Sequence, residues 1–143
     1  MNKNIPYTFF EKYINKVNWY SLSKNTNIPY TFFEKYIDKV YWECLSGNTN
    51  IPYTFFEKHL DKVNWDNLSS NTNIPYIFFE KCLSQKKYID KINWYNLNRN
   101  KNIPYTFFKK HLNKISKFDL SENTSILNYF LKKKFTKNIS CII

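Results

Sequence analysis

The chain of 143 residues is short of several residue types, and each shortage excludes a class of protein. It contains no alanine and a single glycine, Gly47, so a glycine-rich loop that cradles the phosphates of a nucleotide or dinucleotide cannot be built. No run of about 18 apolar residues is present, which excludes a transmembrane helix. The first residues, Met-Asn-Lys-Asn-Ile-Pro, lack the apolar segment of a secretory signal. We therefore expect neither a kinase, P-loop or Rossmann enzyme nor a membrane protein.

Cysteine and arginine are also scarce. The three cysteines, Cys44, Cys82 and Cys141, have no paired spacing, which argues against a disulfide framework and for a reducing, intracellular compartment. Without a shared motif or a nearby histidine they do not indicate a thiol nucleophile either. The single arginine, Arg99, leaves almost no bidentate contacts to guanine, so sequence-specific reading of duplex DNA is not expected.

The residues that are abundant belong to a narrow set. Lys, Asn, Ile, Phe and Tyr make up 82 of the 143 residues, and aromatic residues make up 20%. All five types have codons rich in A and T, which indicates an AT-biased genome and means that composition explains part of the net charge of +11. So much apolar surface is not compatible with a disordered chain.

An internal repeat of 23 residues organises the sequence. The phrase Asn-Ile-Pro-Tyr-Thr-Phe-Phe-Glu-Lys begins at Asn4 and returns with few changes at Asn27, Asn50, Asn73 and Asn102. The fourth repeat carries a six-residue insertion, Cys82–Lys87, which either lengthens a helix by about 1.7 turns or forms a loop. Repeats 1 to 5 cover residues 4–26, 27–49, 50–72, 73–101 and 102–124. Residues 125–143 resemble a sixth repeat cut short, as expected of a terminal cap.

Each repeat predicts two short helices. In repeat 1, apolar residues recur with the 3.6-residue period of an α-helix and so fall on one face. These residues are Phe9, Phe10, Tyr13, Ile14 and Val17. They predict a first helix from about Pro6 to Asn15, with the proline in its first turn. Thr8 and Glu11 form a capping-box pattern that competes for the helix start. Asn18 is a good N-cap for a second helix.

Neither helix is long enough to be stable alone, because isolated helices in water need about 12 to 15 residues. Stacking on neighbouring repeats must supply the stability, with the Phe, Ile, Val, Trp and Leu positions forming one continuous core. The sequence therefore predicts an all-α fold: an α-solenoid of five two-helix repeats plus a C-terminal capping helix, as a single repeat domain over residues 1–143. Strands are the weaker alternative, because the Ile-Pro step and the 3.6-residue period oppose them.

The repeated phrase resembles a known kind of repeat. Asn18-Trp19-x-x-Leu22-Ser23-x-Asn25, joined to Ile-Pro-x-x-Phe-Phe-Glu-Lys, is similar to the short Trp- and Asn-rich repeats of proteins from giant nucleocytoplasmic DNA viruses, including relatives of mimivirus. Those repeats often have Asp-Trp where this chain has Asn-Trp, and Asn-Pro-Asn-Ile where it has Asn-Thr-Asn-Ile. The resemblance covers nearly the whole chain and implies a helical repeat fold and a viral source, with the host cytoplasm as compartment. It implies no reaction.

No residue set predicts catalysis, a cofactor or a metal site. The carboxylates recur four residues apart beside lysines, as at Glu34 and Asp38. This pattern is typical of the solvent-exposed face of a helix. His59, Cys82 and His111 occupy one position of the repeat that elsewhere holds tyrosine. Stacked helices lie roughly 8 to 10 Å apart, too far for one metal to join such a column. We interpret the position as a half-buried packing site.

The positions that vary between repeats predict a binding surface on a constant scaffold. The pair Tyr20-Ser21 becomes Glu43-Cys44, Asp66-Asn67, Tyr95-Asn96 and Phe118-Asp119, and Lys24 becomes Gly47, Ser70, Arg99 and Glu122. The core positions hardly change. We therefore predict a non-enzymatic scaffold for protein–protein interaction. Its candidate partner-binding residues are Tyr20, Glu43, Asp66, Tyr95 and Arg99. Exposed aromatic rings could also stack on the bases of single-stranded nucleic acid. The candidates are Tyr20, Tyr95 and the tyrosine of each Ile-Pro-Tyr step, which lies at the edge of the apolar arc: Tyr7, Tyr30, Tyr53, Tyr76 and Tyr105.

The alternative hypothesis is non-specific binding of nucleic acid. Residues 1–72 carry a net charge of +1 and residues 73–143 carry +10, so the second part could bind phosphates with a steep salt dependence. The candidate phosphate-binding residues are Lys86, Lys87, Lys109, Lys110, Lys132, Lys133 and Lys134. The identity of the protein partner, the oligomeric state and any association with a virion are left open by the sequence.

Overall fold

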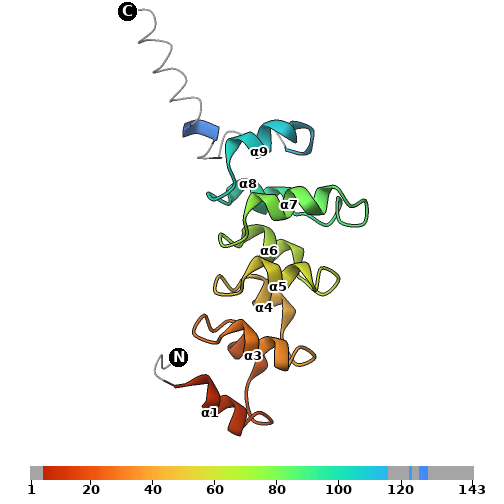
Figure 1. Cartoon of the computed structure of the whole chain (residues 1–143). Coiled ribbons are helices and arrows are strands. Elements are labelled where there is room, and N and C mark those ends of the chain that lie inside the picture. The colour runs from red at the N-terminus through yellow and green to blue at the C-terminus, as the bar shows by residue number, and fades with distance from the viewer. Residues whose placement is uncertain (1–4, 116–122, 124–125, 129–143) are drawn as a thin grey trace, which may run out of the picture. The chain divides into compact units, whose positions relative to one another are not determined.

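The computed structural model describes residues 5–115, 123 and 126–128, and all regular structure within them is helical (Figure 1). The predicted all-α class is thus confirmed for these residues. The chain divides into two compact units, Met1–Ile74 and Pro75–Ile143. We call them the N-terminal and the C-terminal unit and describe each by itself; the single domain over residues 1–143 stays a prediction.

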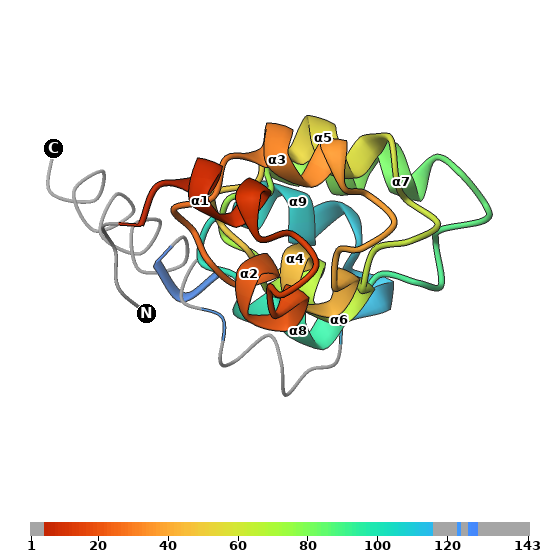
Figure 2. The same cartoon turned by 90° about the horizontal axis from the view of Figure 1, so that it is seen from below.

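The N-terminal unit contains the helix pairs of repeats 1 to 3. Seen end-on, the first helices of its repeats lie on one side and the second helices on the other (Figure 2), and α4 lies against both α2 and α6. The first helices are α1 (Tyr7–Lys12), α3 (Tyr30–Lys35) and α5 (Tyr53–Glu57). The second helices are α2 (Trp19–Ser23), α4 (Trp42–Ser46) and α6 (Trp65–Ser70).

The C-terminal unit holds the helix pair of repeat 4 and the first helix of repeat 5, followed by a short 3-10 helix. These elements are α7 (Tyr76–Leu83), α8 (Trp94–Arg99), α9 (Tyr105–Lys110) and η1 (Leu112–Lys114). Residues 126–128 of the predicted cap are also helical. Among the described residues, no helix is both long and apolar enough to cross a membrane.

Each first helix begins directly after the proline of the Ile-Pro step. Pro6 has extended backbone (φ −64°, ψ 144°), and its carbonyl accepts the N–H of Phe9 at 3.0 Å. Pro6 is therefore the residue before α1 and not part of its first turn. The predicted capping box is wrong, because Thr8 lies inside the helix and no side chain caps its start. Proline meets the need of this position for an extended residue.

The first helix ends three residues earlier than predicted. Tyr13 leaves helical geometry (φ −119°, ψ 32°), so α1 stops at Lys12 and not at Asn15. A turn follows, closed by the N–H of Lys16 on the Tyr13 carbonyl at 2.8 Å. The physical reason is that the chain must cross here to the other helix layer, so the local apolar spacing does not continue the helix.

The second helices begin as predicted. The side chain of Asn18 accepts the N–H of Ser21 at 2.9 Å, and Asn64 and Asn93 cap α6 and α8 in the same way. Tyr41 stands at this position in repeat 2 and makes no side-chain cap. The three asparagines satisfy one of the free N–H groups that every helix start leaves.

The core consists of the residues that hardly change between repeats. Phe32 and Phe33 of α3 are 2% and 0% exposed, and the phenylalanine pairs of α5, α7 and α9 are equally buried. The tryptophans are half-buried and join one repeat to the next: the Trp19 ring stacks on Phe32 with centroids 6.0 Å apart, and Trp94 stacks on Phe107 at 5.9 Å. Repeat 1 differs, because Phe9 is 49% exposed. The prediction that Phe9 belongs to the core is therefore wrong.

Buried asparagines link neighbouring repeats. The Asn48 amide donates to the carbonyls of Ser23 (2.9 Å) and Asn25 (3.3 Å), and Asn71 repeats this pattern one repeat later. In the C-terminal unit, Asn123 donates to the carbonyl of Asn98. Each of these asparagines is at most 3% exposed, so its amide satisfies carbonyls that water cannot reach.

The insertion in repeat 4 extends both a helix and a loop. Helix α7 has eight residues, two more than α9, and this extension includes Cys82, which lies in the core at 2% exposure. The chain then turns at residues 84–87, and Tyr88 donates its N–H to the Gln85 carbonyl at 2.9 Å. Both possibilities that the sequence left open are therefore realised in part.

Candidate interaction surface

The variable positions lie on the exposed side of the second helices. Tyr20 is 48% exposed and Tyr95 is 51% exposed, while Glu43 and Asp66 are also exposed. We call the exposed positions of α2, α4 and α6 the second-helix face. Sequence reasoning thus placed these side chains correctly on the surface.

A groove of about 320 Å³ runs between neighbouring second helices. It brings together two of the predicted residues, Tyr20 and Glu43, with others that the prediction did not select. Asp66 lies on α6 outside the groove lining. The main lining residues are Tyr20, Lys24, Glu43, Cys44, Gly47 and Asn67.

One wall of the groove is a tyrosine fixed by a cation. The Lys24 ammonium donates to the Tyr20 hydroxyl at 3.3 Å and lies 5.0 Å from the centre of its ring. This hydrogen bond is the main reason that the pKa of Lys24 is raised above its ordinary value. The Tyr41 ring packs edge-on against Tyr20 at 5.2 Å. Tyr20 is therefore exposed and contacts both Lys24 and Tyr41.

The opposite wall is polar. The Asn67 amide donates to the Glu43 backbone carbonyl at 2.7 Å, which leaves the carboxylate of Glu43 exposed to solvent. Burial raises the pKa of the Cys44 thiol above its ordinary value of 9.0, so the thiol stays protonated near neutral pH. The groove therefore presents a hydroxyl, an ammonium and a carboxylate, without a nucleophile.

Gly47 opens the floor of the groove. A Cβ atom added there would lie 3.7 Å from both Asn67 Cβ and the Cys44 carbonyl, which is ordinary contact. The backbone is right-handed (φ −88°), so neither space nor conformation requires glycine. The equivalent residues in the other repeats are Lys24, Ser70, Arg99 and Glu122. The missing side chain is thus a property of repeat 2 that enlarges the groove.

The C-terminal unit repeats the tyrosine–cation pair. Arg99 Nη1 donates to the Tyr95 hydroxyl at 2.6 Å, and its guanidinium lies 5.0 Å from the ring centre. The two predicted residues of this unit therefore contact each other. An aromatic ring with a cation four residues later recurs on α2 and α8, while α4 and α6 have an acid at the first of these positions.

The candidate phosphate-binding lysines are not equivalent. Lys86, Lys87 and Lys109 are exposed, but Lys110 is paired with Glu80 at 3.1 Å. The Lys87 ammonium lies 5.4 Å from the ring centre of Tyr88. The remaining candidates, Lys132, Lys133 and Lys134, lie outside the described residues.

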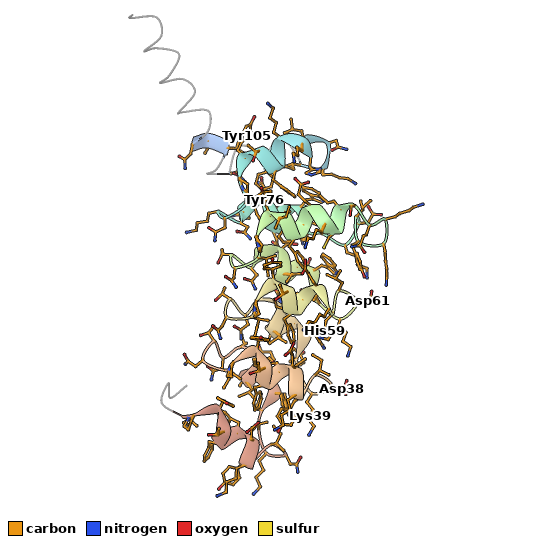
Figure 3. All side chains as sticks on the ribbon, in the orientation of Figure 1. Asp38, Lys39, His59, Asp61, Tyr76 and Tyr105 are labelled. Atoms are coloured by element: carbon orange, nitrogen blue, oxygen red, sulfur yellow. The ribbon has the colours of Figure 1, made fainter. Side chains whose placement is uncertain are left out.

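Ion pairs run from repeat to repeat along the first helices of the N-terminal unit. Lys35 pairs with Glu11 at 2.9 Å and Lys58 with Glu34 at 3.0 Å. At the turns that follow α3 and α5, Asp38 and Asp61 project outward (Figure 3). The glutamates of these pairs are half-buried, whereas Asp38 and Asp61 are exposed.

The histidine positions pack against tryptophan. The His59 ring lies 5.4 Å from Trp42 and 5.0 Å from Phe55, and His111 lies 5.7 Å from Trp94. The described residues contain no group of three His, Cys, Asp or Glu side chains placed to hold a metal ion. Burial, together with repulsion from Lys62 and Lys58, lowers the pKa of His59 below its ordinary value of 6.5.

Comparison of the chain with protein-family models, curated proteins and solved structures finds no match. The function must therefore be argued from the geometry of the chain itself. The sequence did not indicate that Lys24, Gly47 and Asn67 line one groove, or that the missing side chain of Gly47 enlarges it. The change from Lys24 to Gly47 between repeats was the only signal that could have indicated it.

Proposed function

We propose that the protein is a non-enzymatic α-solenoid scaffold whose second-helix face binds a protein partner. The observation that carries this proposal is the division of each repeat into constant buried positions and variable exposed ones. The phenylalanine pair is kept at 0 to 2% exposure in repeats 2 to 5, while the position of Lys24 differs in every repeat and that of Tyr20 changes between Tyr, Glu, Asp and Phe. A fixed frame with varied surface residues is the usual design of repeat proteins that bind other proteins.

The solenoid part of the proposal rests on contacts that recur at intervals of one repeat. The tryptophan stack, the asparagine amide and the lysine–glutamate pair each recur between successive repeats of the N-terminal unit. Contacts limited to nearest neighbours are the defining property of a solenoid.

The groove indicates the chemistry of the partner segment. Its hydroxyl, ammonium and carboxylate groups suit a polar peptide segment that supplies both hydrogen-bond donors and acceptors. Because Tyr20 is already held in place by Lys24 and Tyr41, little side-chain entropy is lost when a partner binds. Tyrosine is also among the residues that contribute most to binding at protein interfaces.

The test is affinity capture from the cells that produce the protein. The native chain is compared with a variant carrying Glu43→Lys and Gly47→Lys, which fills the groove and replaces its carboxylate with an ammonium group. The matched control, Thr31→Lys with Thr54→Lys, changes exposed residues of the first helices. We expect a protein captured by the native chain and the control but lost from the groove variant. If no protein is enriched by the native chain over the groove variant, the proposal fails.

A second candidate function is the non-specific binding of nucleic acid by the C-terminal unit. The exposure of Lys86, Lys87 and Lys109 favours it, and residues 73–143 carry +10 of the net charge. The expected result is binding of a mixed-sequence single strand that weakens steeply with salt. The double variant Lys86→Gln and Lys87→Gln should reduce the slope of log affinity against log salt concentration. The double variant Lys58→Gln and Lys62→Gln should leave that slope unchanged. No mobility shift at low salt would exclude this candidate.

The viral resemblance and the intracellular compartment remain proposals. Cys44 and Cys82 are both free thiols, which supports a reducing compartment.

A further inference from the structure

One carboxylate lines the groove at Gly47. The Glu43 backbone carbonyl accepts the Asn67 amide, but the Glu43 carboxylate makes no hydrogen bond or ion pair with the described residues. The glutamates of the first helices differ, because Glu11 and Glu34 pair with lysines at 2.9 and 3.0 Å. The carboxylate of Glu43 is therefore available to a cation from outside the chain.

The ammonium group of the same groove does not neutralise this carboxylate. Lys24 donates to the Tyr20 hydroxyl at 3.3 Å and lies 5.0 Å from the centre of its ring. Of the groups that raise the pKa of Lys24, the Tyr20 hydroxyl acts most strongly and Glu43 acts least. Tyr20 therefore holds the ammonium on its own wall of the groove, and Glu43 on the other wall stays unpaired within the part of the chain that the structure describes.

Gly47 leaves space at a position where other repeats carry a cation. The equivalent residues of repeats 1 and 4 are Lys24 and Arg99, and each lies on the tyrosine four residues before it. Repeat 2 has Glu43 in place of the tyrosine and no side chain at the second position. An acid followed four residues later by a cation is the favourable order for an ion pair on a helix. Repeat 2 therefore has the acid of such a pair and the room for its cation, but not the cation itself.

The size and lining of the groove suit one guanidinium side chain. Its volume of about 320 Å³ lies at the lower end of the range of ligand pockets, about 300 to 1,000 Å³. Thr26 and Thr49 line it and are exposed, so their hydroxyls can accept further N–H groups. A guanidinium binds a carboxylate through two N–H groups and also packs on an aromatic ring, which an ammonium group does less well. The C-terminal unit contains such a contact, because the Arg99 guanidinium lies 5.0 Å from the Tyr95 ring centre.

We propose that the groove at Gly47 receives an arginine side chain of the protein partner, whose guanidinium pairs with Glu43. This inference rests on the proposed function and names the residue of the partner segment that the groove selects. The second-helix face carries the carboxylates of Glu43 and Asp66 against the ammonium of Lys24, so the balance of charge favours a cation. Lys24 repels the arginine, and its removal should therefore strengthen binding.

The test is an amide NMR titration of the full chain with the peptide acetyl-Gly-Ser-Arg-Ser-Gly-amide at constant ionic strength. The control peptide has citrulline in place of arginine, which keeps the shape of the side chain and removes its charge. We expect saturable shifts of the amides of Glu43, Gly47 and Asn67 with the arginine peptide. Affinity for the citrulline peptide should be about tenfold weaker, as for the loss of one charge-assisted pair. Equal affinity for the two peptides, or no saturable shift at these three amides, would overturn the proposal.

Two substitutions in the chain should change the affinity for the arginine peptide in opposite directions. Glu43→Gln should weaken binding about tenfold, because the carboxylate is lost while the shape of the side chain is kept. Lys24→Met should strengthen binding about twofold, because an exposed repelling charge is lost. Both residues are exposed, so neither substitution disturbs the core. A groove that selects an anion would give the reverse order, and that result would refute the proposal.

A further substitution places the proposed group in the groove from the chain itself. The backbone at Gly47 is right-handed and an added Cβ atom makes only ordinary contacts, so Gly47→Arg should keep the fold. Its guanidinium can pair with Glu43 four residues before it, which should weaken binding of the arginine peptide about tenfold. Gly47→Ser, which copies repeat 3, is the matched control and should leave the affinity nearly unchanged. Full affinity of Gly47→Arg would show that the peptide binds elsewhere.

Affinity capture with Glu43→Gln separates failure of this inference from failure of the proposed function. We expect a partner that the native chain captures to be lost from Glu43→Gln. If that partner is lost from the variant with Glu43→Lys and Gly47→Lys but kept by Glu43→Gln, the groove binds it through another group, and only the arginine is refuted. If the arginine peptide binds as expected and capture enriches no protein, only the proposed function fails.

Discussion

Asparagine has three different structural tasks in the N-terminal unit. Asn18 caps the second helix, Asn25 accepts the N–H of Asn27 in the turn before the next repeat, and Asn48 donates to carbonyls of the repeat before it. The first two tasks need only a short side chain with an acceptor oxygen, and the third needs the amide N–H as a donor. The abundance of asparagine therefore has a physical use as well as a compositional origin.

The buried amide can be tested by a matched pair of substitutions. Asn48→Asp keeps the oxygen that accepts the Asn50 N–H but replaces the donor to two carbonyls with a carboxylate. We expect a loss of about 3 kcal/mol in the free energy of unfolding at neutral pH, because two buried acceptors lose their donor beside a charge. Asn25→Asp, at the half-buried equivalent position in repeat 1, should change it by less than about 1 kcal/mol. Urea unfolding measures both, and equal effects would contradict the role of the amide.

His59 gives the fold a dependence on pH with a defined sign. Its pKa in the folded chain lies below the ordinary value of 6.5 because of burial and then Lys62 and Lys58, with Glu34 acting in the opposite direction. The unfolded chain therefore binds the proton more readily, and stability is lost as pH falls below about 6.5. His59→Tyr, which copies Tyr36, should remove this part of the slope between about pH 7.5 and 5.5. An unchanged slope in urea unfolding would show that other groups are responsible.

At the scale of the element, the same six residues form a helix with a buried phenylalanine pair in α3 and a helix without buried residues in α1. The sequence Tyr-Thr-Phe-Phe-Glu-Lys is identical in both, so helix propensity cannot cause the difference in burial. Only α3 has a preceding tryptophan stacked on it. The stability of a first helix is thus a property of the contact between two repeats.

This contrast predicts unequal effects of one substitution. Phe32→Ala should reduce the free energy of unfolding by about 3 to 5 kcal/mol, as for a fully buried phenylalanine. Phe9→Ala should reduce it by about 1 kcal/mol, because half of its side chain already faces solvent. The two variants remove the same atoms from the same sequence, so each is the control for the other. Similar shifts in the urea midpoint would show that α1 is covered in solution.

The sequence predicted the helix pairs and the Asn18 cap because both follow from local chemistry. It did not predict the end of α1 at Lys12, since the turn there is imposed by the crossing to the other layer and not by Tyr13 itself. It also did not reveal the groove at Gly47. That groove combines side chains from α2, α4 and α6 that come together only when three repeats stack.

At the scale of the molecule, the distribution of charge along the chain is independent of the pattern of core positions. Repeats 2 and 3 are slightly acidic, and residues 73–143 carry +10, yet the same core positions are kept in both regions. The fold therefore does not depend on where the charge lies. This leaves the surface free to differ along the chain while the interior stays the same.

The whole molecule should tolerate loss of a full repeat better than loss of half a repeat. Deleting residues 27–49 joins Thr26 to Asn50 in register, so Trp19 can stack on Phe55 as it now stacks on Phe32. Deleting residues 27–38 removes fewer residues but takes out all of α3, which leaves two second helices in succession and no phenylalanine pair between them. We expect the 23-residue deletion to keep helical circular dichroism and a cooperative urea transition, with a lower midpoint. The shorter deletion should lose the transition, because the alternation of the two helix layers is broken; if it is the milder of the two, stability does not come from stacking of whole repeats.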